Sequence, residues 1–247
     1  MICNFGATPI SLPEQKNKML VRIICSYVLL SKKKFAKICI FATSKPYNLI
    51  TSQPHLLMSQ WKETVVLIDA DHLDSVCFNL IVNFERMLGR RIPQADLCHW
   101  LDCIALDGGI RAGENEVQVI FLHSKSKEKM TNMTPSVFDK ELNCQAFKDH
   151  LAEFTLASYP VEDVVTMADF YMQSFDALLE AKDVKRILLV PALDEYGDRV
   201  RQTALKAEGK DIVLFTMQPT QERGYLQELL GYSLMSALGI RGDELQG

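Results

Sequence analysis

One stretch, residues 65–74, constrains the fold of this chain more than any other. Its sequence, VVLIDADHLD, runs from four apolar residues straight into three carboxylates. A short apolar run rich in Val and Ile is typical of a strand buried on both faces, as in a parallel sheet. Open α/β sheets bind ligands just beyond the carboxyl ends of their strands. The stretch therefore predicts a central strand that ends at a candidate site containing Asp69 and Asp71.

Apolar runs of the same kind alternate with helical patterns along the rest of the chain. Strands are predicted at 117–122, 154–159, 186–190 and 212–216, and helices at 73–88, 95–106, 137–151, 166–181, after 198 to about 208, and 221–238. Strands that alternate with helices indicate right-handed βαβ units. We predict an α/β fold with three layers (α/β/α) and a mainly parallel five-stranded sheet, in a single domain over residues 58–247.

Residues 1–57 differ from the rest in charge and pattern. They carry eight Lys or Arg and one acidic residue, a net charge of +7, whereas the remaining residues carry −11. The apolar run 19–30 is too short to span a bilayer, and lysines follow it, whereas a secretory signal has its positive charge in front. We expect residues 1–57 to be a non-core extension, either disordered or the product of a mis-assigned start, and we expect no membrane association.

The composition bears on partners and on the cell compartment. The acidic body argues against broad, non-specific nucleic-acid binding, which depends on phosphate neutralisation, but it leaves room for a local basic groove. Seven scattered cysteines fit reduced thiols in a cytoplasmic protein better than a disulfide framework. The candidates for a basic path are Arg90, Arg91, Lys125, Lys127, Lys129 and Arg201.

Three acidic groups fall at predicted strand ends or helix starts. They are Asp69 with Asp71, then Asp169, and then Asp194 with Glu195 and Asp198. Clustered carboxylates resist full ionisation unless a cation neutralises them, and Mg²⁺ or Mn²⁺ held by them activates water against a phosphodiester. Acidic residues also cap helices and favour their N-terminal dipole. Both interpretations stay open for each of these residues.

The order of these segments resembles that of the NYN domain, a branch of the PIN-like nuclease fold, over Lys62 to about Pro219. That family ends a strand with an Asp-Gly-Glu-Asn-like motif, and this chain has Asp69-Ala70-Asp71-His72 at that place. The family's middle helix opens with Val-Asp, which Ala168-Asp169 matches, and carries a further Asp, to which Asp176 corresponds one position late. The resemblance implies a Mg- or Mn-dependent endoribonuclease that acts on single-stranded RNA. It implies catalytic roles for Asp69, Asp169 and Glu195, and a metal-binding set of Asp69, Asp71, Asp169, Asp194 and Glu195.

The fourth strand is followed by the weightiest departure from that family. Where the family has Ser-Gly-Asp-x-Asp-Phe, this chain has residues 191–196, PALDEY, so Leu193 stands where a key Asp belongs. An apolar group in place of a ligand removes both charge and coordination, which lowers metal affinity steeply. The hypothesis is therefore a ribonuclease with weakened or lost catalysis.

Two alternatives remain. One is a non-catalytic PIN-like module that binds a protein partner, a nucleotide or a second copy. The other is a haloacid-dehalogenase-like phosphatase, because Asp69 and Asp71 are two residues apart, like the nucleophile and acid/base of that family. The lysine and the acidic pair that this second family needs would have to follow Thr216, where only a short helix and tail remain.

Overall fold

The computed structural model describes residues 48–49, 61–219 and 224–245, all of which belong to one unit of the chain, residues 39–247. The predicted extension, residues 1–57, lies outside the described residues except for the two-residue strand β1 (Asn48–Leu49). No helix in the described ranges is long and apolar enough to cross a membrane.

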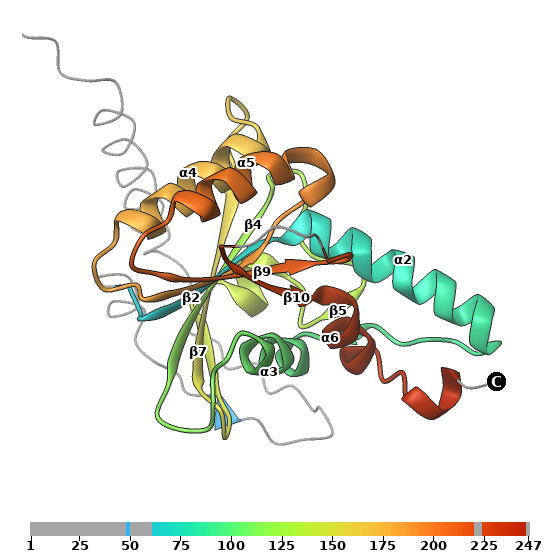
Figure 1. The fold of residues 1–247 in the computed structure, drawn as a ribbon. Helices are drawn as coiled ribbons and strands as arrows, with labels where there is room; N and C mark the ends of the chain where they lie inside the picture. Colours follow the sequence, from blue (N-terminus) through green and yellow to red (C-terminus); the bar gives the residue numbers. More distant parts are fainter. Residues whose placement is uncertain (1–47, 50–60, 220–223, 246–247) are drawn as a thin grey trace, which may run out of the picture. The chain divides into compact units, whose positions relative to one another are not determined.

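The main sheet is mixed and mostly parallel, as the alternating pattern predicts. Its strands lie in the order β1-β6-β7-β4-β2-β8-β9-β10 (Figure 1). The pairs from β7 to β10 are parallel, and β6 pairs antiparallel with β7 and with β1. A separate small sheet pairs β3 (Ala95–Asp96) with β5 (Met133–Thr134). The strands of the main sheet after β1 are β2 (Thr64–Asp69), β4 (Glu116–Ser124), β6 (Gln145–Lys148), β7 (Glu153–Val161), β8 (Arg186–Val190), β9 (Asp211–Thr216) and β10 (Leu226–Leu229).

The prediction of five strands is wrong, in part because two outer strands, β6 and β10, were predicted as helix. The segment 137–151 contains a short π-helix, η2 (Phe138–Leu142), and then β6. Cys144, with φ 57°, lies between them in the left-handed region that ends a helix. Strand β10 occupies part of the predicted helix 221–238, of which only α6 (Leu230–Ala237) is helical among the described residues. The five strands that the apolar runs predicted are all present, as β2, β4, β7, β8 and β9.

Helices cover both faces of the sheet (Figure 1). Helices α4 (Met167–Glu180) and α5 (Leu193–Lys206) lie on one face, and α3 (Leu97–Asp107) packs against α6 on the other. Helix α2 (Ala70–Leu88) follows β2, and η3 (Gly242–Leu245) closes the described chain. Gly89 ends α2 with φ 62°, as the Gly after the last apolar position predicts.

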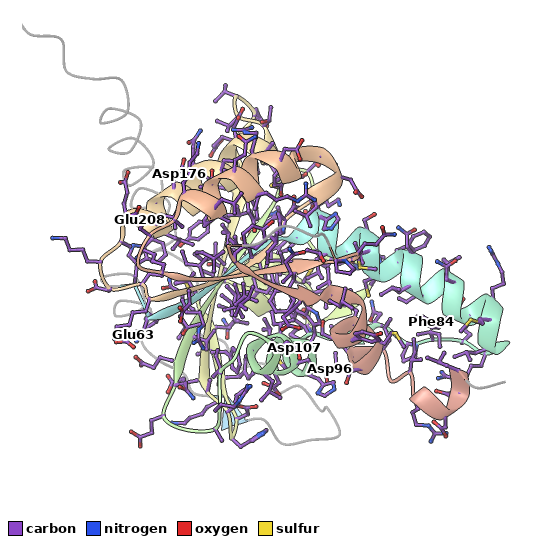
Figure 2. All side chains as sticks on the ribbon, viewed as in Figure 1. Glu63, Phe84, Asp96, Asp107, Asp176 and Glu208 are labelled. Carbon is purple, nitrogen blue, oxygen red and sulfur yellow. The ribbon has the colours of Figure 1, made fainter. Side chains whose placement is uncertain are left out.

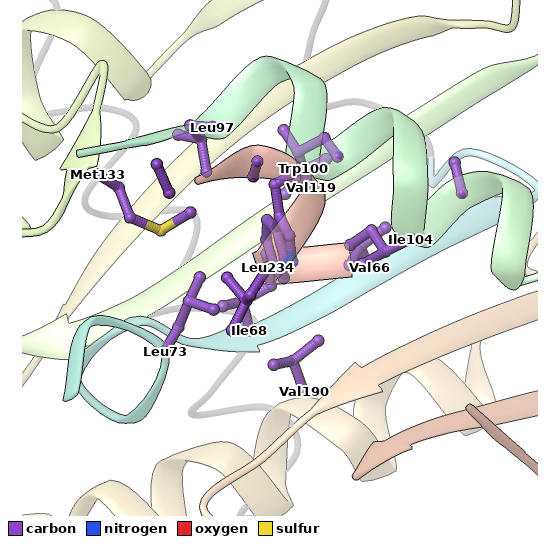
Figure 3. Close-up of a cluster of buried hydrophobic side chains, with 14 of the residues drawn as sticks. Val66, Ile68, Leu73, Leu97, Trp100, Ile104, Val119, Met133, Val190 and Leu234 are labelled. Atoms are coloured by element: carbon purple, nitrogen blue, oxygen red, sulfur yellow. The ribbon is translucent and has the colours of Figure 1, made fainter. Parts of the chain in front are cut away.

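The largest buried cluster lies on the α3 and α6 side of the sheet. Figure 3 shows Val66 and Ile68 of β2 among Trp100 of α3 and Leu234 of α6, all of them fully buried. Side chains alternate between the two faces of a strand, so Val65, Leu67 and Asp69 point to the α4 and α5 side. Packing of β2 thus directs the Asp69 carboxylate toward α4 and α5.

Candidate functional site

The strand order reverses direction at β2, which places a topological switch point beside Asp69. From β2 the chain builds outward through β4 and β7 on one side, and through β8, β9 and β10 on the other. Open α/β sheets bind their ligands outside the carboxyl ends of the strands at such a switch point. Here the switch point lies between the ends of β2 and β8, where Ile68 is paired with Val190 and Asp69 is the next residue.

Asp69 is buried at this point, with 2% of its surface exposed. It is the N-cap of α2, since its Oδ1 accepts a hydrogen bond from the His72 backbone N–H at 3.0 Å. Its Oδ2 accepts one from the Tyr196 hydroxyl at 2.6 Å. Burial raises the pKa of Asp69, and these two hydrogen bonds oppose that rise. Both carboxylate oxygens are therefore engaged by donors of the same chain.

Tyr196 bridges the ends of β2 and β8, a role that the sequence analysis missed. Its hydroxyl donates to Asp69 and accepts a hydrogen bond from the Ala192 backbone N–H at 3.1 Å. Its ring lies 5.3 Å from the ring of Tyr171 on α4, and only 4% of Tyr196 is exposed. The backbone of Tyr196 is non-helical (φ −136°, ψ 20°), which kinks α5 after its first turn. The kink lets the side chain reach back to the end of β2.

Asp71 is held by the neighbouring strand and by the loop after it. The Ser124 backbone N–H donates to Asp71 Oδ2 at 3.0 Å, and the Ser124 hydroxyl donates to the same oxygen. Lys127 Nζ lies 3.2 Å from Asp71 Oδ1. This carboxylate therefore joins the start of α2 to the end of β4.

Asp169 lies in the first turn of α4 and is paired there. Its backbone N–H donates to Thr166 Oγ1 at 3.1 Å, and its Oδ1 lies 3.0 Å from a guanidinium nitrogen of Arg199 on α5. Burial and the nearby Glu180 raise the pKa of Asp176, and Arg199 opposes that rise. Asp176 is exposed on the same helix, farther from the carboxyl edge of the sheet (Figure 2). Arg199 thus links the outer face of α4 to α5.

The remaining predicted acids, Asp194 and Glu195, are exposed in the first turn of α5. Their charges act on His72. Burial lowers the pKa of His72, while the charges of Asp69, Asp194 and Glu195 act to raise it. Leu193, which precedes them, is partly buried. Four of the five predicted metal-binding residues therefore lie near the switch point, and Asp169 is engaged with Arg199.

The predicted metal set lacks a preformed coordination sphere in this arrangement. In the described ranges, no three His, Cys, Asp or Glu side chains come together as a group that could hold a metal ion. The oxygens of Asp69 and Asp71 already face hydrogen-bond donors or Lys127. These residues, as placed, do not fit Mg²⁺ or Mn²⁺, which need several oxygen ligands around one point.

The predicted basic path is balanced by acids of the same chain. Several of its members pair with nearby carboxylates: Arg90 with Glu244, Lys125 with Asp163, Lys127 with Asp71, and Arg201 with Asp198. Each of these four cations therefore faces a carboxylate of the same chain.

The fold and site define an α/β protein whose mostly parallel sheet carries Asp69 and Asp71 at its carboxyl edge, each hydrogen-bonded within the chain. Residues 58–245 match the model of a family of unknown function (DUF6621), and the chain belongs to that family. Neither the curated proteins nor the solved structures contain a match to the chain.

Proposed function

We propose that this chain is a PIN-like, NYN-type protein that has lost metal-dependent hydrolysis and works as a binding module at the carboxyl edge of its sheet. One observation carries the proposal: Asp69, the leading acid of the motif, is 2% exposed and both its oxygens accept hydrogen bonds, from Tyr196 and His72. Each carboxylate oxygen has a second lone pair, but a metal could reach it only if the side chains that cover Asp69 moved, because the residue is buried. Any loss of the two hydrogen bonds in that movement would cost about 1–3 kcal/mol for each buried donor left unpaired.

The neighbouring residues support the same conclusion. Leu193 supplies no oxygen where the related family has a carboxylate, and Asp71 and Asp169 are each paired with a cation, Lys127 and Arg199. An internal cation satisfies a carboxylate without a metal. The resemblance to RNA nucleases makes single-stranded RNA the ligand to test. Lys127 and Arg199 are the cations to test, because their side chains are 45% and 52% exposed and could exchange their carboxylate partners for phosphates.

Binding is tested by fluorescence anisotropy of a labelled single-stranded RNA in low salt. We expect Lys127→Glu and Arg199→Glu each to weaken binding several-fold and to lower the slope of log K against log salt by about 1. The matched control is Lys185→Glu. Lys185 is also an ion-paired lysine, but it lies beside the amino end of β8, on the opposite edge of the sheet. Equal weakening by all three variants would reduce the effect to net charge, and absence of binding would refute RNA as the ligand.

A metal-dependent ribonuclease is the second candidate, favoured by the negative charges of Asp69, Asp194 and Glu195, all of which act on His72. The proposal of lost catalysis predicts no heat of Mn²⁺ binding by calorimetry, no rise in Tm with millimolar Mn²⁺ and intact RNA on a denaturing gel. A ligand that binds only the folded state raises stability with its concentration over Kd. A rise in Tm that Asp69→Asn abolishes would therefore establish a metal site at Asp69, and RNA cleavage that the same substitution abolishes would establish the ribonuclease. The phosphatase has the least support, since a nucleophilic Asp69 would need an accessible oxygen.

A further inference from the structure

The distal half of α2 carries more apolar surface than the described chain covers. The buried residues of the helix end at Cys77, although seven of the eleven residues from Phe78 to Leu88 are apolar. This half of α2 extends beyond the sheet (Figure 1). A helix that is apolar around most of its circumference is normally buried on all sides, so this segment has the character of an interface.

Only one side of that segment packs against the body of the protein. Leu80, Ile81, Phe84 and Leu88 are partly buried against the core, and Phe84 lies on the side of α2 that faces the body (Figure 2). Phe78, by contrast, is 53% exposed, and Val82, one turn further on, is partly exposed. Residues four apart share a helix face, so Phe78 and Val82 form an outward apolar strip.

The outward strip is symmetric about its centre. Adding the residues on the same face gives Ser75, Phe78, Val82, Arg86 and Gly89, separated by three, four, four and three positions; we call these five residues the α2 stripe. Val82 is partly exposed and the other four are exposed. From Val82 outward, each half of the stripe has a larger side chain first, Phe78 or Arg86, and a small residue at its end.

We propose that the α2 stripe is the contact between two copies of this chain, with the two α2 helices packed antiparallel about a two-fold axis at Val82. In such a contact residue i meets residue j, and j meets i. Phe78 of each copy then faces Arg86 of the other, which gives two cation–π contacts. Val82 meets its own equivalent, and Ser75 meets Gly89, so small residues let the helices approach at both ends.

The charges of the stripe favour a second copy over an unrelated apolar partner. The only charged residue of the stripe is Arg86, and the described residues show no ion pair for it. A purely apolar partner would bury this cation without compensation, which is costly. The antiparallel arrangement gives each Arg86 an aromatic face, and the same operation covers both exposed phenyl rings.

Sedimentation velocity of the full chain tests the proposal over about 1 to 200 µM, a range that brackets a micromolar Kd. We expect the mass to rise from the 28.0 kDa of one chain toward twice that value. Phe78→Lys should weaken the dimer at least tenfold, because it places a second cation opposite Arg86 of the other copy. The matched control is Met87→Lys, because Met87 is 61% exposed on the opposite flank of the same helix; it should leave the dimer unchanged. Unchanged circular dichroism would show that both variants are folded.

A cysteine at the proposed axis tests the geometry. Val82→Cys should form an intermolecular disulfide under mild oxidation, because a two-fold axis there brings the two residues within the roughly 7 Å between Cα atoms that a disulfide requires. Asn83→Cys, exposed on the polar side of α2, should not cross-link above the wild-type background. A wild-type chain that stays monomeric at every concentration overturns the proposal. Equal loss of the dimer in Phe78→Lys and Met87→Lys, or preferred cross-linking through Asn83→Cys, overturns the assigned interface.

Discussion

Replacing Tyr196 by Phe removes one oxygen from the switch point and tests how Asp69 is stabilised. The hydroxyl is buried, donates to Asp69 at 2.6 Å and accepts from the Ala192 N–H at 3.1 Å. A hydrogen bond to a charged group contributes about 1.5–3 kcal/mol and an ordinary one about 1 kcal/mol. We therefore expect the free energy of unfolding at neutral pH to fall by about 3 kcal/mol. In a domain of this size that corresponds to a fall in Tm of about 6–12 °C.

The pH dependence of this loss distinguishes a charged acceptor from a neutral one. Burial already raises the folded-state pKa of Asp69, and loss of the Tyr196 bond raises it further. The folded variant therefore binds the Asp69 proton more tightly than the folded wild type does. For this reason the variant is least stable relative to wild type at pH values above the folded-state pKa of Asp69 in both proteins. The difference should shrink to that of a neutral bond, about 1 kcal/mol, as Asp69 becomes protonated.

Tyr171→Phe is the matched control for this measurement. Tyr171 is buried beside Tyr196, but its hydroxyl donates to the neutral Leu67 carbonyl at 3.0 Å. Its replacement should cost about 1 kcal/mol at every pH. Urea unfolding of both variants across the acidic range measures the two costs. Equal, pH-independent losses in Tyr196→Phe and Tyr171→Phe would refute the role assigned to the Asp69 carboxylate.

Two further stability predictions follow from buried polar groups. His123 stacks on Phe138 with 3.8 Å between the ring centroids, and its Nε2 is buried with no hydrogen-bond partner among the described residues. Burial lowers the pKa of His123, so the folded state binds fewer protons and stability falls as pH drops below the unfolded pKa of about 6.5. His123→Phe should reduce this slope of stability against pH in urea titrations, and an unchanged slope would count against the prediction. The Asp74 Oδ1 accepts from the backbone N–H groups of Thr131 and Asn132, both at 2.8 Å. Asp74→Ala should therefore cost about 3–5 kcal/mol by leaving buried donors unpaired, whereas Asp74→Asn, which keeps an oxygen, should cost less; equal costs in chemical denaturation would contradict this role.

The parallel core of the sheet was predictable because its central strands contain continuous apolar runs. A strand buried on both faces has apolar residues at successive positions, and β2, β8 and β9 each have four in a row. Strands β6 and β10 were missed because they lack such a run. Strand β10 reads LQEL and β6 reads QAFK, and four mixed residues fit a helix pattern as well as a strand. Their strand state depends on pairing with β9 and β7, which no local pattern contains.

The candidate site divides in the same way. Parallel strands bring their carboxyl ends to one edge, so the neighbourhood of Asp69, Asp71 and Asp194 could be expected from the pattern alone. The partners of these acids could not. Tyr196 is 127 residues from Asp69, and Ser124 is 53 residues from Asp71. The reach of Tyr196 also depends on the kink at its own backbone, for which the sequence offers only the following Gly197 as a signal.

Under the proposed function, Leu193 and the hydrogen bond from Tyr196 to Asp69 are best understood together. A metal site keeps several carboxylates close and relies on the cation to offset their repulsion. Because Leu193 supplies no ligand, the buried carboxylate of Asp69 needs another source of stabilisation. A neutral hydrogen-bond donor stabilises it whether or not a metal ion is present. Tyr196 is that donor, positioned three residues after Leu193 by the first turn of α5. Restoring an acid at Leu193 alone would therefore add a second negative charge beside a carboxylate that is already satisfied. Recovery of metal binding should require the removal of the Tyr196 hydroxyl as well.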